Sequence, residues 1–450
     1  MQNHGLKRSL GFIDVTCLGI NNVVGAGIFL LPGQISGCAG HNAVWVFPVC
    51  GILCFVIALC FAEMGGRYHA TGGAYLYARE AFGSFAGFLV GWMMWLASII
   101  GWASVASGFS LYAAYFLPTE SSWVSGALTT LLIGGLSAMN YFGVKPGSGV
   151  INFFTVGKLL SLLIFVGVGL FFIQGNHSLT TTEDGGWQTG PYGEGNFHAA
   201  IIMALYAYTG FEFIAVPAGE MRHPRRDIPR VLFFVLVAVT GLYVTIQIVA
   251  AGTSPSLTVS DKPLADAAQS FMGRAGGVLI GTGALLSIGG VNAGIALTSP
   301  RSLYVLSADG FLPGIFSKLH QTYRTPYWGI LLNAVLTLAL SLTGSFKYLI
   351  AASVMVSILQ YIPTCLAVIV LRRYRKEQER GYMIPGGYVV PVAALMICGW
   401  LMYHVELKVI AATAIAIVLS LPIYFQRRQH ASMLCIGQRK GQGRGGLNNP

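Results

Sequence analysis

The sequence contains few charged residues. Asp, Glu, Lys and Arg make up 10% of its 450 residues, whereas a soluble globular domain carries roughly 25%. Hydrophobic residues account for 54% of the chain, and the mean hydropathy is +0.66. This scarcity of charge excludes an ordinary soluble domain, and the composition predicts an integral membrane protein.

The short motifs of catalysis and metal binding are also missing. The sequence has no G-x-S-x-G, H-E-x-x-H or Walker pattern, its eight cysteines form no C-x-x-C pair, and its nine histidines are scattered. Serine hydrolases, zinc proteases, nucleotide-binding loops and small zinc domains each require one of these spacings. We therefore expect neither an enzyme nor a metal site, and no cofactor.

The chain has instead a series of long apolar segments. A helix needs about 20 apolar residues to cross a bilayer, so the sequence predicts an all-α integral membrane protein with about 12 transmembrane helices. The segments lie near residues 10–35, 43–65, 85–116, 123–142, 150–174, 197–219, 230–252, 276–306, 327–343, 347–371, 388–404 and 408–426.

Basic residues lie mainly in alternate loops between these segments. About 22 of the 27 Lys and Arg lie near the N-terminus, in every second loop or in the C-terminal tail, and about four lie in the intervening loops. Cytoplasmic loops carry an excess of Lys and Arg, so we expect a multi-pass protein of the cell (inner) membrane with both termini in the cytoplasm. The alternation accounts for the net charge of +11 without a nucleic acid partner.

The first apolar segment contains a cluster of residues that weaken helices. Gly25-Ala26-Gly27 is followed by Pro32 and Gly33 in a run long enough to span the bilayer. Glycine and proline interrupt helices, and backbone groups freed inside a membrane must face protein or a wet cavity. The cluster therefore predicts a polar site at membrane depth.

A second break lies in the sixth segment. Thr209 and Gly210 interrupt an apolar run, and Pro217 follows a few residues later. The two breaks fall at similar depths of their segments. Their pairing is typical of secondary transporters, in which the substrate binds between two broken helices.

The positions of the breaks predict the domain organisation. If residues 10–174 and 197–371 form two halves of five helices each, the odd number reverses the second half and produces a five-plus-five inverted repeat. Residues 388–426 then add two helices to a single transporter domain, 1–426. Residues 427–450 are expected to form a disordered cytoplasmic tail.

Five ordered motifs resemble those of the amino acid, polyamine and organocation (APC) superfamily, especially its bacterial amino acid permeases. They are GAGIFLLPG at 25–33, FAEMGGRYHATGGAYLYAREAFG at 61–83, NYFGVKPG at 140–147, TGFEFIAVPAGEMRHPRRDIPR at 209–230 and PRSLYVLSADGFLPGIF at 300–316. The chain departs from the family pattern at His69, where proline is more common, and at Asn21-Asn22, where glycine is common. The resemblance implies a LeuT-like fold with discontinuous helices 1 and 6.

The two breaks also predict what the site binds. We expect a new half-helix to begin near Ile28, where unpaired N–H groups would hold a carboxylate; the resemblance assigns this role to the backbone of Gly25–Gly27. Carbonyls left open before each break are acceptors suited to an ammonium group, so an α-amino acid satisfies both ends. The predicted substrate site comprises Val24, Gly25, Ala26, Gly27 and Ile28 at the first break, Tyr206, Ala207, Tyr208, Thr209, Gly210 and Phe211 at the second, and Ser104 and Asn292 beside them.

The side chains of this site suggest its selectivity. The resemblance implies that an aromatic residue near Tyr206 or Phe211 acts as a gate over the substrate, although simple packing also accounts for each ring. None of the candidate substrate contacts is charged. A neutral substrate is therefore favoured over a basic one.

Lys158 and Glu212 are the ionisable residues predicted to couple transport to protons. Ionisable residues inside a membrane are candidates for function. Lys158 can snorkel to the interface, or it can face the carbonyls freed by the first break. Burial penalises the charged form of an amine, so a protonation cycle is accessible there. Glu212 follows the second break, where it can act as a gate or proton carrier, or cap a helix.

Taken together, these features predict a secondary active transporter. We expect proton-coupled symport of a neutral amino acid by alternating access, with the amino acid, the proton and the lipid bilayer as its partners. An amino acid/amino acid or amino acid/polyamine exchanger is the alternative of the same class, while a membrane enzyme or a channel is the alternative of a different class. The sequence carries no prediction of oligomeric state.

Overall fold

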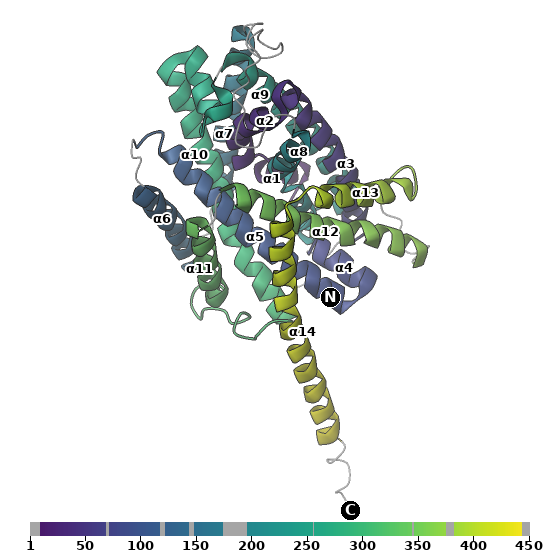
Figure 1. Ribbon diagram of the computed structural model, residues 1–450. Coiled ribbons are helices and arrows are strands. Elements are labelled where there is room, and N and C mark those ends of the chain that lie inside the picture. The colour runs from purple at the N-terminus through teal and green to yellow at the C-terminus, as the bar shows by residue number, and fades with distance from the viewer. Residues whose placement is uncertain are drawn as a thin grey trace, which may run out of the picture.

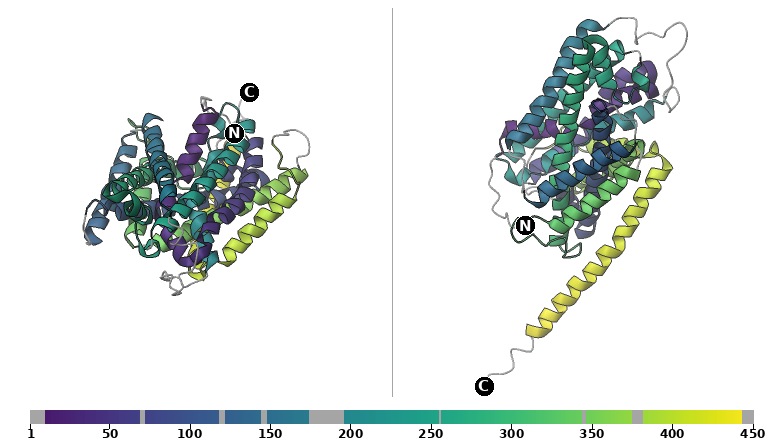
Figure 2. Two further views of the ribbon diagram at one scale, coloured as in Figure 1. Left: turned by 90° about the horizontal axis from the view of Figure 1, so that it is seen from above. Right: turned by 90° about the vertical axis from the view of Figure 1, so that its left-hand side faces the viewer.

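The computed structural model describes residues 10–68, 72–117, 122–143, 148–173, 196–254, 256–343, 346–374 and 382–442. Across these ranges the chain forms fourteen α-helices and five short 3-10 helices. The helices pack into one bundle, and α14 extends beyond it (Figures 1 and 2). Within these ranges every regular element is a helix, as predicted.

Each of the twelve predicted apolar segments coincides with helix in the structure. The α-helices are α1 Phe12–Val23, α2 Ala26–Ala39, α3 Ala43–Arg67, α4 Ala74–Phe82, α5 Ser84–Ala113, α6 Ser122–Tyr141, α7 Ser148–Gly169, α8 Phe197–Tyr208, α9 Pro224–Thr253, α10 Pro263–Ala308, α11 Tyr327–Thr343, α12 Phe346–Tyr374, α13 Val389–Tyr403 and α14 Leu407–Gln442. The 3-10 helices are η1 Gly40–Asn42, η2 Leu170–Phe172, η3 Phe211–Ala215, η4 Ala218–Glu220 and η5 Leu257–Val259.

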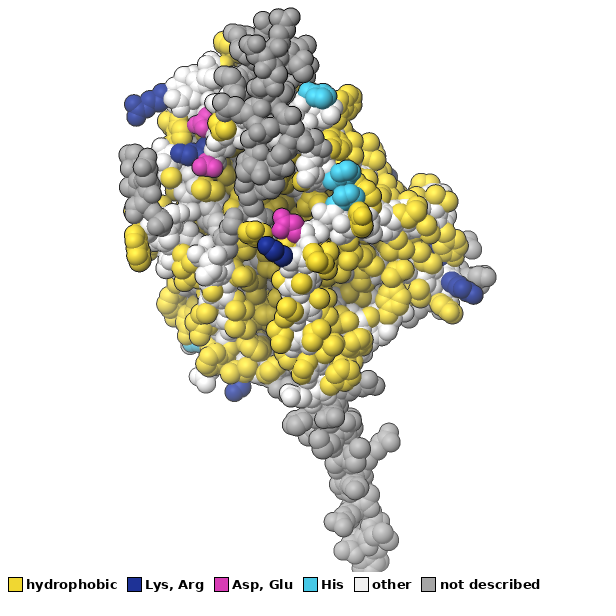
Figure 3. All heavy atoms as spheres, viewed as in Figure 1, with side chains coloured by type: hydrophobic (Ala, Val, Ile, Leu, Met, Phe, Trp, Pro, Cys, Tyr) yellow, Lys and Arg dark blue, Asp and Glu magenta, His cyan; other side chains and the backbone are white. Residues whose placement is uncertain are grey.

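The lengths and surfaces of these helices are those of a membrane protein. Within the described ranges, eight helical stretches are long and apolar enough to cross a bilayer. Hydrophobic side chains cover most of the face shown in Figure 3, with few charged groups among them. Apolar side chains of this kind face lipid without the cost that exposure to water would bring.

Several elements differ from the expectation. Helix α4 was not predicted, and α10 begins thirteen residues before the predicted start at 276 because it continues through a kink at Gly273, whose φ is +66°. Residues 427–442, where the sequence predicts a disordered tail, continue α14, while 443–450 lie outside the described residues.

The broken elements lie inside the bundle. Thirteen of the fourteen residues of α2 are buried, and so are the last nine residues of α8. Helix α2 packs against α8, α10 and η5, and α8 packs against α3 and α12. Helices α3, α5, α7, α9, α10 and α12 therefore form the wall around the two breaks (Figure 1).

Candidate functional site

The first break separates α1 from α2 by two residues. Helix α1 ends at Val23, and Val24 (ψ 86°) and Gly25 (ψ −147°) leave the helical conformation before α2 begins at Ala26. The new helix thus starts two residues before the predicted Ile28. The first four N–H groups of a helix have no partner within it, so the donors of α2 begin at Ala26.

The second break has a different form. Helix α8 ends at Tyr208, Gly210 takes a φ of +117°, and the chain continues as the 3-10 helix η3. The Val216 N–H donates to the Phe213 oxygen at 3.1 Å in the tighter 3-10 pattern. Pro217 has no N–H with which to close an α-helical turn onto Phe213. The chain therefore continues after this break as a 3-10 helix rather than as an α-helix.

Two glycines allow the breaks to touch each other. A Cβ on Gly27 would lie 2.7 Å from the Ala207 Cα, and a Cβ on Gly210 would lie 2.5 Å from the Asn22 carbonyl oxygen. Neither approach is possible for a residue with a side chain. The sequence predicted these glycines as helix breakers, and the structure adds that Gly27 brings α2 into contact with α8 while Gly210 brings the second break into contact with α1.

The Tyr243 hydroxyl bridges the two breaks. This fully buried side chain of α9 lies 3.0 Å from the Val23 carbonyl oxygen and 3.0 Å from the Ala207 carbonyl oxygen. Its single hydrogen can be donated to either oxygen. The last residue of α1 and the end of α8 are thereby held through one hydroxyl group, which was not predicted from the sequence.

The Lys158 ammonium lies against the end of α1. Its Nζ donates to the Asn21 oxygen at 3.1 Å and to the Val24 oxygen at 2.8 Å, and the side chain is 0% exposed. Both oxygens belong to the last turn of α1 or to the residue after it, where no following helical N–H is available. Of the two alternatives for Lys158, the structure has the one that faces the break rather than the one that snorkels.

A second donor completes the environment of Val24. The Ser287 hydroxyl of α10 donates to the Val24 oxygen at 3.3 Å, in addition to Lys158. A carbonyl oxygen has two lone pairs, so both acceptor positions of Val24 are used. The carbonyls predicted for a substrate ammonium are therefore partly satisfied by the protein itself.

Ser104 and Asn292, the two residues predicted beside the breaks, have different surroundings. Ser104 of α5 and Tyr206 of α8 share a hydrogen bond of 2.9 Å, and the Tyr206 ring lies 6.5 Å from that of Phe346. Asn292 of α10 is 0% exposed and donates to Ile288 of its own helix at 2.8 Å. Its Oδ1 has no hydrogen-bond partner among the described residues.

Two aromatic residues of the second break face away from Tyr206. The Phe211 ring lies 5.8 Å from Phe61 and 5.4 Å from Tyr361, in an aromatic cluster between α3 and α12. The Tyr208 hydroxyl donates to the Phe47 carbonyl oxygen at 2.9 Å. These contacts place both rings in the core between neighbouring helices.

The two remaining predicted residues of the second break satisfy local backbone groups. The Glu212 carboxylate accepts the Gly210 N–H at 2.9 Å and is 5% exposed. The Thr209 hydroxyl donates to the Tyr206 oxygen at 2.7 Å. Both contacts stabilise the irregular backbone of the break.

Three acidic residues near helix ends bind backbone N–H groups or basic side chains. Asp14 accepts the Gly11 N–H at the start of α1, and Glu63 pairs with Arg372 of α12. Asp309 accepts from Tyr75 and pairs with Arg79 at 3.1 Å. Burial, reinforced by the hydrogen bond to Asp309, raises the pKa of Tyr75 above its ordinary value, so its hydroxyl remains a donor at neutral pH.

Three further residues at the breaks were not predicted from the sequence: Tyr243, Ser287 and Thr155, whose hydroxyl donates to the Asn21 Oδ1 at 3.3 Å. Each is a polar residue in an otherwise apolar helix, and this is the sequence feature that could have identified it. Many other serines, threonines and tyrosines of the chain share that signal, so it does not identify these three.

Comparison with known proteins agrees with the geometry. A family model described as amino acid permease matches residues 10–424. The chain is 27% identical over 452 residues to the branched-chain amino acid permease BcaP of Bacillus subtilis, covering 95% of each protein. It is 28% identical over 404 residues to the serine/threonine exchanger SteT of the same species, covering 88% of this chain and 90% of the relative.

The chain is also similar to part of the human cationic amino acid transporter 4, a longer protein. It is 29% identical over 385 residues, which cover 82% of this chain and 60% of the human protein. The family match spans nearly all of the membrane bundle, including both breaks. The chain therefore belongs to the amino acid permease family of the APC superfamily and is a multi-pass membrane protein that transports amino acids.

Proposed function

We propose that this transporter carries a neutral amino acid together with a proton. The observation that carries the proposal is the Lys158 ammonium on the Asn21 and Val24 oxygens at the first break. A group that gains and loses a proton in contact with the broken helix can link protonation to the shape of the binding site.

The membrane arrangement that we propose is LeuT-like. Helices α1 to α7 and α8 to α12 contain the two five-helix halves, α13 and α14 follow them, and both termini are cytoplasmic. The paired breaks in α1/α2 and α8/η3 support this arrangement, because inverted-repeat transporters place the substrate between such breaks. Alternating access then follows from the movement of one helix group against another.

The substrate carboxylate binds the N–H groups at the start of α2, from Ala26 to Ile28. These donors and the positive end of the helix dipole favour an anion. The substrate amine binds the remaining carbonyls at the ends of α1 and α8; Val24 is the weakest candidate because Lys158 and Ser287 already use its oxygen. Tyr206, with Ser104 behind it, is the better gate, since Phe211 faces the α3 and α12 cluster.

The position of Lys158 also disfavours sodium as the coupling ion. A sodium ion at the first break would need the same backbone oxygens as ligands, and an ammonium group already donates to two of them. A sodium ion and an ammonium group that share these oxygens would lie close together, and like charges repel each other strongly in a low-dielectric site. The proton is therefore the favoured coupling ion.

Exchange of one amino acid for another is the second candidate. It is favoured by the similarity to SteT, which is described as a serine/threonine exchanger. Such a mechanism would use the same breaks and the same lysine, and the two candidates differ in what drives net uptake.

Uptake into liposomes distinguishes the candidates. We expect purified protein to accumulate a radiolabelled neutral amino acid when the outside is acidified, equally well in sodium and in choline buffers. Lys158→Ala should lose the response to the proton gradient, while Lys318→Ala, which removes an exposed lysine, should keep it. Exchange of labelled for unlabelled substrate without a gradient shows that each variant is folded.

Two results would overturn the proton proposal. One is uptake that depends on sodium or is unchanged in Lys158→Ala. The other is uptake that requires amino acid inside the liposomes and ignores the proton gradient, which would establish the exchanger.

A further inference from the structure

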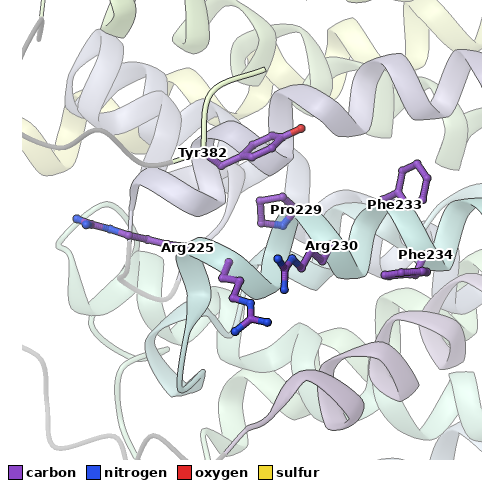
Figure 4. A pocket seen from close by; sticks show the side chains of 7 residues that line it. Arg225, Pro229, Arg230, Phe233, Phe234 and Tyr382 are labelled. Carbon is purple, nitrogen blue, oxygen red and sulfur yellow. The ribbon is translucent and has the colours of Figure 1, made fainter. Parts of the chain in front are cut away.

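A pocket of about 500 Å³ lies at the N-terminal end of α9, away from the two breaks. It is lined by Arg225, Arg226, Pro229, Arg230, Phe233, Phe234 and Tyr382. Figure 4 shows Arg225 at one end of this row, Arg230 near its middle, Phe233 and Phe234 at the other end, and Tyr382 across from Pro229. The pocket therefore has a cationic end and an apolar end.

The cationic end of the pocket contains arginine side chains that form no ion pair among the described residues. Three guanidinium groups line it, all on exposed residues of the first two turns of α9. Among the described residues, neither Arg226 nor Arg230 forms an ion pair. Guanidinium groups bind phosphate oxygens through paired hydrogen bonds, so this end fits a phosphate group.

The apolar end continues along the lipid-facing side of α9. Phe233 is 48% exposed, Phe234 is 53% exposed, and Val237 on the next turn is 54% exposed. Together with Arg226 and Arg230 they follow the 3.6-residue period of one helix face. Helix α9 is among the stretches able to cross the membrane, and the arginines lie at its end.

We propose that this pocket binds an anionic phospholipid. The phosphate binds the arginine end at the membrane surface, and an acyl chain lies along Phe233, Phe234 and Val237. A soluble phosphate would use only the arginines, and a zwitterionic lipid would bring a cationic group close to them. The arrangement of charge followed by apolar surface matches both parts of an anionic lipid.

The bound lipid would lie beside the helix that carries the first break. The Phe234 ring packs at 6.0 Å against Phe12 of α1. Leu10, two residues before α1, is also tied to this region, because its N–H donates to the Glu220 oxygen at 3.1 Å and the Arg222 N–H donates to the Leu10 oxygen at 3.0 Å. The lipid thus stabilises the contact between α1 and α9.

Native mass spectrometry of the purified full chain tests the proposal. The probes are phosphatidylglycerol and phosphatidylcholine with the same acyl chains. We expect the wild type to retain phosphatidylglycerol preferentially, and Arg226→Gln/Arg230→Gln to bind it about 30-fold more weakly, at about fivefold for each arginine near an anionic lipid. Both arginines are exposed, so the variant should keep its fold, as a thermal melt will show.

A matched control removes the same charge elsewhere. Lys318→Gln/Arg373→Gln also lowers the net charge by two at exposed positions and should retain the lipid. Phe233→Ala should weaken lipid retention while all three arginines remain, and excess inorganic phosphate should not displace the lipid.

Three outcomes would overturn the proposal. Equal loss in the control pair would show a general effect of net charge. Equal retention of phosphatidylcholine would show that the phosphate charge is not recognised. Displacement by inorganic phosphate, with no effect of Phe233→Ala, would identify a site for a soluble anion.

Discussion

Single polar groups decide how the broken backbone is satisfied. The carbonyl oxygens of Asn21, Val23 and Val24 lie where α1 ends, and each accepts a hydrogen bond from a side chain of another helix. Unsatisfied backbone groups inside a membrane are costly. The break is therefore stabilised because α7, α9 and α10 supply Lys158, Tyr243 and Ser287 as hydrogen-bond donors.

Tyr243→Phe tests the connection between the breaks. The ring keeps its contacts with Phe47 and Tyr208. The buried oxygens of Val23 and Ala207 lose a hydrogen-bond donor, and we expect this loss to lower the free energy of unfolding by about 1–3 kcal/mol. We expect a lower melting temperature and a higher KM for amino acid uptake, because the ends of α1 and α8 are no longer held together.

Tyr112→Phe is the control for this substitution. It also removes a buried hydroxyl, but that group donates to the Phe29 oxygen of α2 and not to the Val23 or Ala207 oxygen. We expect a similar loss of stability and a smaller change of KM. Equal changes of KM in both variants would contradict the bridging role of Tyr243.

At the scale of elements, close approach of backbones organises the site. Helix α2 meets α8 at Gly27, and the second break meets α1 at Gly210. Small residues let helices approach closely inside membranes, where packing replaces the hydrophobic effect as the driving force between helices. The contact between the two broken elements therefore depends on the absence of side chains at these two positions.

Gly27→Ala should separate α2 from α8. The added methyl group would lie 2.7 Å from the Ala207 Cα, so the backbone must shift, at about 1–3 kcal/mol. We expect a lower melting temperature and loss of substrate-induced stabilisation. Gly294→Ala in α10, which meets nothing within 4 Å, should instead gain about 0.5–1 kcal/mol from helix propensity. A wild-type response of Gly27→Ala to substrate would show that the approach is not required.

At the scale of the whole molecule, the bundle holds the site between elements distant in the sequence. Lys158 and Asn21 are 137 residues apart, and Tyr243 and Val23 are 220 residues apart. The movement of one helix group against another that we propose for transport would change these contacts together. Binding that favours one arrangement therefore stabilises the entire fold.

Ligand-induced stabilisation tests whether both ends of the amino acid are recognised. A ligand at 100 times its dissociation constant stabilises the folded state by about 2.7 kcal/mol. We expect a thermal shift with at least one neutral amino acid, and none with the matching amine that lacks the carboxylate or the matching acid that lacks the amine. A shift with a polyamine instead would refute the two-ended site, because a polyamine offers no anion to the N–H groups of α2.

Prediction from sequence succeeded where the signal is local. The apolar runs located the helices because a bilayer requires length and hydrophobicity within one segment. Gly25, Gly27 and Gly210 located the breaks because glycine acts on its own backbone. The start of α2 and the 3-10 form of η3 were missed, since both depend on a balance of a few hydrogen bonds around residues such as Pro217.

The sequence alone determined the membrane environment, the helical class, the two breaks and, through its motifs, the family. Only the tertiary structure decided which groups satisfy the breaks: that Lys158 faces Asn21 and Val24, that Tyr243 joins Val23 to Ala207, and that Phe211 turns toward α12. The physical reason is distance along the chain. Hydrophobicity and helix breaking are properties of neighbouring residues, whereas a hydrogen bond to a freed carbonyl depends on how separate helices pack.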